Sequence, residues 1–247
     1  MFFIQEGCGG PEGKICYLPV PKASVSILLF KRCLTGRAFC TAAAPAPSYL
    51  YISMLSVIQE TQQDFLKDLG LSGQDFARLD QLVQGDSKYL KDLRINLKTA
   101  LQSENVTSIE AYLIALSAAV NEENNTLIES FRALAASHGA TDAELAEAVA
   151  VTSLLSTNNI LYRFKHFMHT DFYESAPAKV KMNIMMNPVT GKEFFELVSL
   201  AISAINGCER CVTSHEESVR KLGASEQRIF DAVRIAAVVV GVSKVIR

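Results

Sequence analysis

The sequence of 247 residues contains no tryptophan, no long apolar run and no excess of charge of either sign. A helix needs roughly 18 consecutive apolar residues to cross a membrane, so no transmembrane segment is predicted. A net charge of −2 excludes the basic surface that nucleic acids require. The strand pattern, in which Val, Ile and Tyr alternate with polar residues, is also missing. The 49% of hydrophobic residues therefore indicate a compact helical protein, which we expect in the cytoplasm.

No cysteine occurs between Cys40 and Cys208, and composition differs on the two sides of Met54. Residues 1–53 hold four of the six cysteines and five of the seven prolines, and they lack the charge-then-apolar order of a signal peptide. We interpret residues 1–53 as a disordered or non-native extension, with Met54 as the true start; a targeting or regulatory arm is the alternative. Residues 54–247 are predicted to form the folded domain, and a chain starting at Met54 is expected to fold and react like the whole.

Apolar residues recur at helical spacing after Met54, and three Thr-x-x-Glu patterns predict capping boxes at helix N-termini. In a capping box the threonine hydroxyl and the glutamate carboxylate each accept a hydrogen bond from backbone N–H groups of the first turn. The three patterns are Thr107–Glu110, Thr141–Glu144 and Thr190–Glu193.

Two segments repeat each other, which predicts a duplicated domain with copies at about residues 107–165 and 190–247. Residues 116–121 align with residues 201–206 at an offset of 85, and residues 139–142 align with residues 223–226 at an offset of 84. The larger offset places Cys208, Cys211 and His215 on Glu123, Thr126 and Ser130. The chemistry is therefore predicted in the second copy alone.

The pattern Cys208-Glu209-Arg210-Cys211, followed by His215, places two thiols and an imidazole on one face if the segment is helical. Such a pair can form a disulfide, and a nearby imidazole raises the thiolate fraction. A zinc site needs about four ligands, and no second pair follows. Haem attachment requires histidine at position 212, which is Val212. A thioredoxin-like site needs a strand before it, and unreactive core cysteines remain the structural alternative. A redox-active dithiol is favoured.

Glu196 begins a narrow polar stripe on an otherwise apolar predicted helix. The stripe continues through Ser199, Ser203 and Asn206 toward the cysteines, and its alternative interpretation is a solvated face. A partly buried carboxylate with a raised pKa is predicted, and it could exchange a proton with Cys208 or His215. The other histidines are interpreted as structural; they are His138, His166 and His169.

The run from Asn206 to Glu216, with Glu196 twelve residues before the first cysteine, resembles the alkyl hydroperoxidase D family of the carboxymuconolactone decarboxylase-like superfamily. Residues 158–164 and 181–183 are also similar to that family. The resemblance covers about residues 54–247. It implies an all-α, pseudo-duplicated fold that assembles as a homotrimer, with no tightly bound cofactor.

The same resemblance implies a thiol-dependent peroxidase and disulfide reductase. Its electrons would come from dihydrolipoamide on an acyltransferase, recharged by dihydrolipoamide dehydrogenase, and would pass to peroxides and to the peroxiredoxin alkyl hydroperoxide reductase C. Cys211 would become the sulfenic acid and Cys208 the proton donor and disulfide partner, with Glu196 and His215 as proton relay. Some members carry histidine where this chain has Arg210, which cannot relay protons. The alternatives are a decarboxylase-like or ligand-binding member, or a non-enzymatic thiol sensor.

Overall fold

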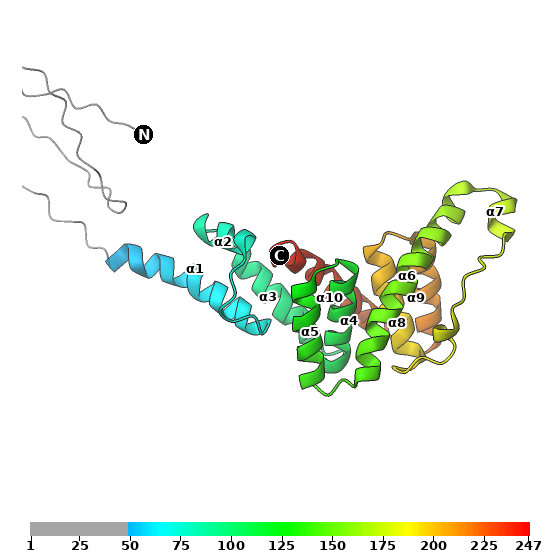
Figure 1. Cartoon of the computed structure of the whole chain (residues 1–247), viewed down its shortest axis with the longest axis horizontal. Helices are drawn as coiled ribbons and strands as arrows, with labels where there is room; N and C mark the ends of the chain where they lie inside the picture. Colours follow the sequence, from blue (N-terminus) through cyan, green and yellow to red (C-terminus); the bar gives the residue numbers. More distant parts are fainter. Residues whose placement is uncertain (1–48) are drawn as a thin grey trace, which may run out of the picture. The chain divides into compact units, whose positions relative to one another are not determined.

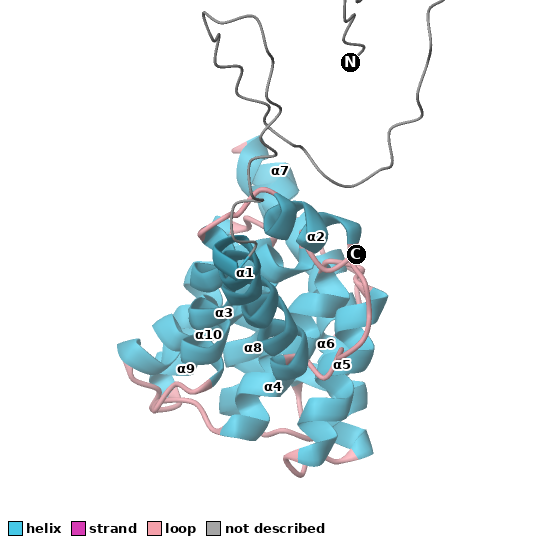
Figure 2. Ribbon diagram, turned by 90° about the vertical axis from the view of Figure 1, so that its left-hand side faces the viewer, coloured by secondary structure: helices cyan, strands magenta, loops and turns pink. Residues whose placement is uncertain are grey.

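The computed structural model describes residues 49–247, with side chains from Val57 onward (Figure 1). All regular structure in this part of the chain is helical, which confirms the all-α prediction (Figure 2). The interpretation of residues 1–53 lies outside the described residues, apart from positions 49–53 at the start of α1. The elements are α1 (Tyr49–Asp68), α2 (Ala77–Gln84), α3 (Tyr89–Leu101), α4 (Ser108–Asn121), α5 (Asn125–Ser137), α6 (Asp142–Met168), α7 (Asp171–Ser175), the 3-10 helix η1 (Asn183–Met185), α8 (Lys192–Ile205), α9 (Glu209–Lys221) and α10 (Glu226–Ser243).

A three-helix pattern occurs twice, as α4–α5–α6 and as α8–α9–α10. The first residues of these helices are Ser108, Asn125 and Asp142 in one set and Lys192, Glu209 and Glu226 in the other, always 84 residues later. The corners agree as well, since Glu123 and Gly207 both have positive φ angles, of 53° and 65°. A single offset of 84 therefore relates the two sets.

The alignment at an offset of 85 was consequently wrong by one residue for the first helix and its corner. The structural counterparts of Cys208, Cys211 and His215 are Asn124, Leu127 and Phe131. Asn124 is the N-cap of α5, and its side chain accepts a hydrogen bond from Leu127, whereas Cys208 occupies the N-cap of α9 without a side-chain cap. The copy without cysteines thus has an ordinary polar cap at the position of the first thiol.

Capping boxes form at two of the three helix starts where the sequence predicts them and not at the third. Thr107 and Thr141 form complete capping boxes with Glu110 and Glu144, as predicted. Thr190 does not cap α8, whose N-cap is Gly191. The third capping box was therefore a wrong prediction, and the other partner of Thr190 explains why.

Buried Glu147 of α6 binds the loop before α8, and its hydrogen bond with the Thr190 side chain replaces the cap that this threonine was predicted to form. Its carboxylate accepts hydrogen bonds from the backbone N–H groups of Val189 and Thr190, at 2.7 and 2.8 Å, and from the Thr190 hydroxyl. A charged acceptor with three donors is a stronger arrangement than one neutral cap. These three hydrogen bonds fix the position of the loop that leads into α8.

Helices α4 and α8 form the centre of the domain. Helix α4 packs against α5, α6, α8 and α10, and α8 packs against α6, α9 and α10. Every residue from Phe194 to Ser203 is buried, because α8 has neighbours on several sides. A helix that is apolar all round is expected in such a position. The buried α8 supplies a rigid base for the residues that follow it.

Arg228 of α10 joins the two copies through an ion cluster. Its guanidinium donates to Glu110 of α4 at 2.6 Å and to Glu193 of α8 at 2.9 Å. Replacing Arg228 with Met would leave two facing carboxylates without a cation, so the free energy of unfolding is expected to fall by about 3 kcal/mol. Urea unfolding monitored by circular dichroism measures this loss.

The matched control is Lys221→Met, which removes an exposed ion pair with Glu217. Exposed pairs contribute at most about 1 kcal/mol. Equal losses of stability in Arg228→Met and Lys221→Met would contradict the role given to the cluster.

Candidate active site

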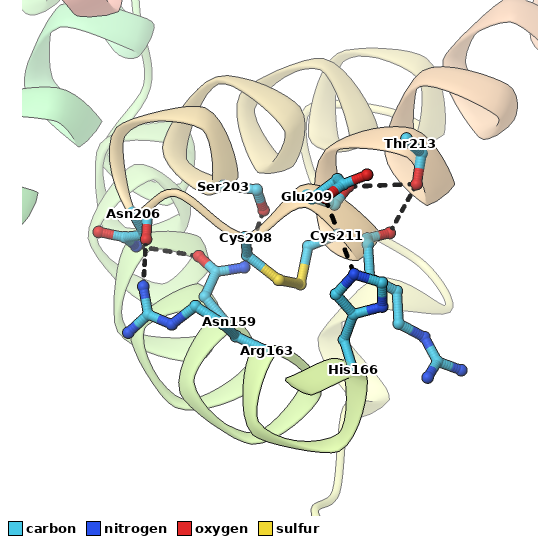
Figure 3. Close-up of a disulfide and its surroundings, with 10 residues drawn as sticks. Asn159, Arg163, His166, Ser203, Asn206, Cys208, Glu209, Cys211 and Thr213 are labelled. Carbon is cyan, nitrogen blue, oxygen red and sulfur yellow. Dashed lines mark hydrogen bonds and ion pairs between the residues drawn. A yellow bond between two sulfur atoms is a disulfide. The ribbon is translucent and has the colours of Figure 1, made fainter. Parts of the chain in front are cut away.

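Cys208 and Cys211 form a disulfide at the N-terminus of α9 (Figure 3). Their Cα atoms are 5.3 Å apart, within the range of about 4.4–6.8 Å that disulfides need. Cys208 is the N-cap residue and has φ −97° and ψ 89°, so it lies just outside the helix. The sequence predicted both cysteines and His215 within one helix. Cys211 and His215 do lie in α9, but Cys208 precedes it.

The start of α9 favours a charged sulfur once the disulfide is open. Cys211 lies in the first turn, where backbone N–H groups lack intrahelical partners and the helix dipole attracts negative charge. The backbone N–H of Cys208 donates to the carbonyl of Ser203 at 3.1 Å, which ties the thiol loop to the end of α8. Cys208 is fully buried and Cys211 is 6% exposed. The pair is shielded, with Cys211 the more accessible of the two.

Glu196 of α8 and His215 of α9 are joined by a short hydrogen bond. The distance from His215 Nδ1 to Glu196 Oε2 is 2.6 Å, and their side chains are 12% and 5% exposed. Lys192 Nζ lies 2.8 Å from the other carboxylate oxygen. Because His215 follows Cys211 by four residues on α9, both side chains leave the same face of that helix. The structure thus brings together the carboxylate, the imidazole and the dithiol helix.

The pKa of Glu196 is lowered, which corrects the raised value predicted from the sequence. Burial is the largest influence and acts to raise the pKa, but hydrogen bonds from His215 and Lys192 and the charges of both groups outweigh it. The carboxylate is therefore ionised at neutral pH. Its lowered pKa stabilises the fold above the ordinary carboxyl range, and this contribution is lost as the pH falls through the lowered pKa.

The polar stripe on α8 is buried rather than solvated. Ser199 and Ser203 are fully buried, and the amide of Asn159 on α6 donates to the Ser203 hydroxyl at 2.9 Å. Asn206 donates to the carbonyl oxygen of Asn159, also at 2.9 Å, and Arg163 donates to the backbone carbonyl of Asn206 (Figure 3). These contacts fix the turn that leads into Cys208.

Four residues were missed as site residues: Asn159, Arg163 and His166, which Figure 3 shows beside the disulfide, and Glu174, which binds Arg210. Arg210 donates to both carboxylate oxygens of Glu174 at 2.6 Å, and this ion pair raises the pKa of Arg210 and holds its guanidinium away from a relay role. His166, interpreted from the sequence as structural, lies 3.7 Å from Glu209. The asparagine-rich start of residues 158–164 was the available signal, but sequence spacing alone did not connect it to α9.

No cluster of three or more potential metal ligands occurs within the residues that the structure describes. None of the helices described between residues 49 and 247 is long and apolar enough to cross a membrane.

The helices that carry the dithiol match a known protein family. The model of the carboxymuconolactone decarboxylase family matches residues 174–247, which include α8, α9 and α10. The three-helix unit with the disulfide is thus a carboxymuconolactone decarboxylase domain.

Three curated relatives extend the similarity beyond that domain, and each is named alkyl hydroperoxide reductase AhpD. The protein of Anaeromyxobacter dehalogenans (strain 2CP-C) is 37% identical over 163 residues, covering 66% of this chain and 87% of the relative. That of Azorhizobium caulinodans is 37% identical over 151 residues, covering 61% and 83%. That of Methylobacterium sp. (strain 4-46) is 38% identical over 161 residues, covering 65% and 91%. The chain belongs to the AhpD family of alkyl hydroperoxide reductases.

Proposed function

We propose that this protein reduces alkyl hydroperoxides with the Cys208–Cys211 dithiol. The observation that carries the proposal is the buried cysteine pair at the start of α9, on the helix that also holds the Glu196–His215 hydrogen bond. A decarboxylase would have no use for a disulfide-forming pair. The names of the relatives support the same class of reaction.

The first step is attack of the Cys211 thiolate on a peroxide oxygen. The O–O bond breaks, the sulfur becomes a sulfenic acid, and the leaving alkoxide takes a proton to give an alcohol. The Cys208 thiol donates this proton, and the Glu196–His215 pair then returns one to the site. The position of Cys211 in the first turn of α9 stabilises its thiolate before the attack.

In the second step Cys208 attacks the sulfenic sulfur, which forms the disulfide and releases water. The Cα separation of 5.3 Å lets this condensation occur without unfolding the turn. Cys211 is thus the oxidised thiol and Cys208 the resolving partner.

Dihydrolipoamide closes the cycle by thiol–disulfide exchange. We propose that the dihydrolipoamide is carried by an acyltransferase and recharged by dihydrolipoamide dehydrogenase, and that the peroxiredoxin alkyl hydroperoxide reductase C is a second electron acceptor. No cofactor needs to remain bound, because both electrons are stored in the two cysteines. A homotrimer is the proposed assembly.

A coupled assay tests this function. It contains the full chain, lipoamide, dihydrolipoamide dehydrogenase, NADH and tert-butyl hydroperoxide, and it follows NADH absorbance. The dehydrogenase first reduces the added lipoamide, and the peroxide is added once that initial NADH consumption has ended. We then expect continuous NADH consumption that requires both the protein and the peroxide. Further consumption only up to the amount of added protein would indicate a thiol sensor that reacts once. No further consumption after the peroxide is added would favour a ligand-binding or decarboxylase-like member.

A further inference from the structure

His166 brings a second imidazole to the disulfide from a different helix. It lies near the end of α6, which packs against α9, and its Nε2 is 3.7 Å from the carboxylate of Glu209. Glu209 directly follows Cys208 in the chain. Figure 3 shows the His166 ring on the α6 side of the disulfide, directed toward the first turn of α9. The imidazole therefore borders the site that the cysteines form.

Among the side chains labelled around the disulfide in Figure 3, His166 is the imidazole, the group suited to proton transfer near neutral pH, and Glu209 is an exposed carboxylate beside it. Arg163, labelled there, and Arg210, which precedes Cys211 in the chain, remain charged throughout the physiological range. Arg210 is held by Glu174, and Arg163 donates to a backbone carbonyl. The asparagine, serine and threonine side chains there do not titrate in this range. His166 is thus the available acid–base group on this side.

Exposure separates the two imidazoles of the site. The side chains of His215 and Glu196 are 12% and 5% exposed, so their proton is shielded from water. The side chains of His166 and Glu209 are 38% and 80% exposed, so they exchange protons with solvent directly. Reduction of a disulfide takes up protons from outside the site. The exposed pair has the position that this uptake requires.

We propose that His166 is the proton donor to the dithiol when the Cys208–Cys211 disulfide is reduced. This inference rests on the proposed reductase function. A donor thiolate attacks Cys211, the more exposed sulfur of the pair, and the S–S bond breaks. The electron pair of that bond goes to Cys208, and its thiolate takes the proton of the His166 imidazolium. A mixed disulfide, a Cys208 thiol and a neutral His166 result.

The donor completes the exchange with its second thiol. That thiolate attacks its own mixed-disulfide sulfur, which forms the donor disulfide and releases the Cys211 thiolate. The donor loses two electrons and the cysteine pair gains them. His166 regains its proton from water, on the side where it lies next to the exposed carboxylate of Glu209.

Several charged or titratable groups face His166, and a pH profile must be interpreted with them in place. From α9 they are Glu209 and Arg210, and from α7 the facing group is Glu174. From the α6 side, Tyr162 lies one turn before His166, and His169 is the C-cap of α6, with its ring centroid 5.9 Å from that of His166. His169 is the matched control, because it shares the environment but not the contact with Glu209.

The test measures reduction of the preformed disulfide in His166→Gln, His166→Asn and His169→Gln full-length chains. Dihydrolipoamide and dithiothreitol are used separately, between pH 5.5 and 8.5. Samples are quenched with acid, alkylated and analysed by mass spectrometry. Each rate is divided by the thiolate fraction of the reductant, so that only protons supplied by the protein remain in the profile.

The parent and His169→Gln are expected to show a normalised rate that falls as the pH rises, because a proton donor acts only while protonated. Both His166 variants should be slower by about 10-fold or more at pH 6 and should have flat profiles. Parent-like profiles in both variants, or an equal slowing at every pH, would overturn the proposal. If dihydrolipoamide fails with the parent while dithiothreitol shows the His166 effect, the proposed electron donor is wrong and the role of His166 stands.

Discussion

Replacing Cys211 with Ser is expected to reduce NADH-coupled peroxide turnover to the rate without protein. A hydroxyl in the first turn of α9 cannot form a stable oxoanion at neutral pH, and the sulfur that attacks the peroxide is gone. Cys208→Ser should also stop turnover, but after one reaction. Its Cys211 should become a sulfenic acid that no neighbouring thiol resolves.

The two variants are distinguished by trapping with dimedone and mass spectrometry. Cys208→Ser should acquire one adduct at Cys211 after a single addition of peroxide, and Cys211→Ser should acquire none at Cys208. As a control, the four cysteines in residues 1–53 are replaced together by Ser, which should leave turnover unchanged. A dimedone adduct at Cys208 in Cys211→Ser, with peroxide still consumed, would reverse the roles of the two thiols.

Replacing His215 or Glu196 with Gln is expected to slow turnover by about 10- to 1000-fold, the scale of one general acid–base group. Either change removes the carboxylate–imidazole pair that is joined at 2.6 Å and leaves a glutamine that does not titrate in its place. Because Lys192 also contacts Glu196, the Glu196→Gln variant additionally loses the partner of that lysine. Both variants should still form the Cys208–Cys211 disulfide, since no sulfur is changed.

Iodoacetamide alkylation of the reduced protein against pH is the second measurement for these variants. The parent should show an apparent thiolate pKa below the free cysteine value of about 8.5. The midpoint should rise in His215→Gln, and it belongs to the coupled groups rather than to Cys211 alone. Glu216→Gln is the control, because Glu216 lies beside His215 on α9 but faces Arg220 at 3.9 Å. Unchanged turnover and alkylation in all three variants would reduce Glu196 and His215 to structural residues.

Local sequence signals predicted much of the fold. The capping boxes at Thr107 and Thr141 are each complete within four residues, and the distant Arg228 binds Glu110 without displacing it from Thr107. Thr190 has the same pattern, but Glu147 reaches it from 43 residues away and binds it instead. A pattern search cannot detect that competition, because it is decided by the packing of α6 against α8.

The repeat was visible in the sequence, but its register was not. A residue with positive φ ends both first helices, and it is Glu123 in one copy and Gly207 in the other. Glycine adopts that conformation readily and glutamate does so rarely, so the corner was not recognised as equivalent. The structure aligns the corners by backbone conformation, which moves the counterpart of Cys208 to Asn124.

The sequence grouped those residues of the candidate site that are close to one another in the chain. Cys208, Cys211 and His215 are on or beside α9, and Glu196 is on the preceding helix. The pKa of Glu196 was predicted in the wrong direction because burial alone was considered, although Lys192 is only four residues away. His166 is more than forty residues from the cysteines, and only the packing of α6 against α9 brings it to them.

A single-turnover experiment tests the central claim most directly. Fully reduced protein is mixed with one equivalent of tert-butyl hydroperoxide, quenched with an alkylating agent and mapped by peptide mass spectrometry, while the alcohol product is quantified. One equivalent of alcohol should form, and the peptides of Cys208 and Cys211 should be joined by a disulfide and carry no alkyl group. Formation of alcohol with both of these cysteines fully alkylated would contradict the account.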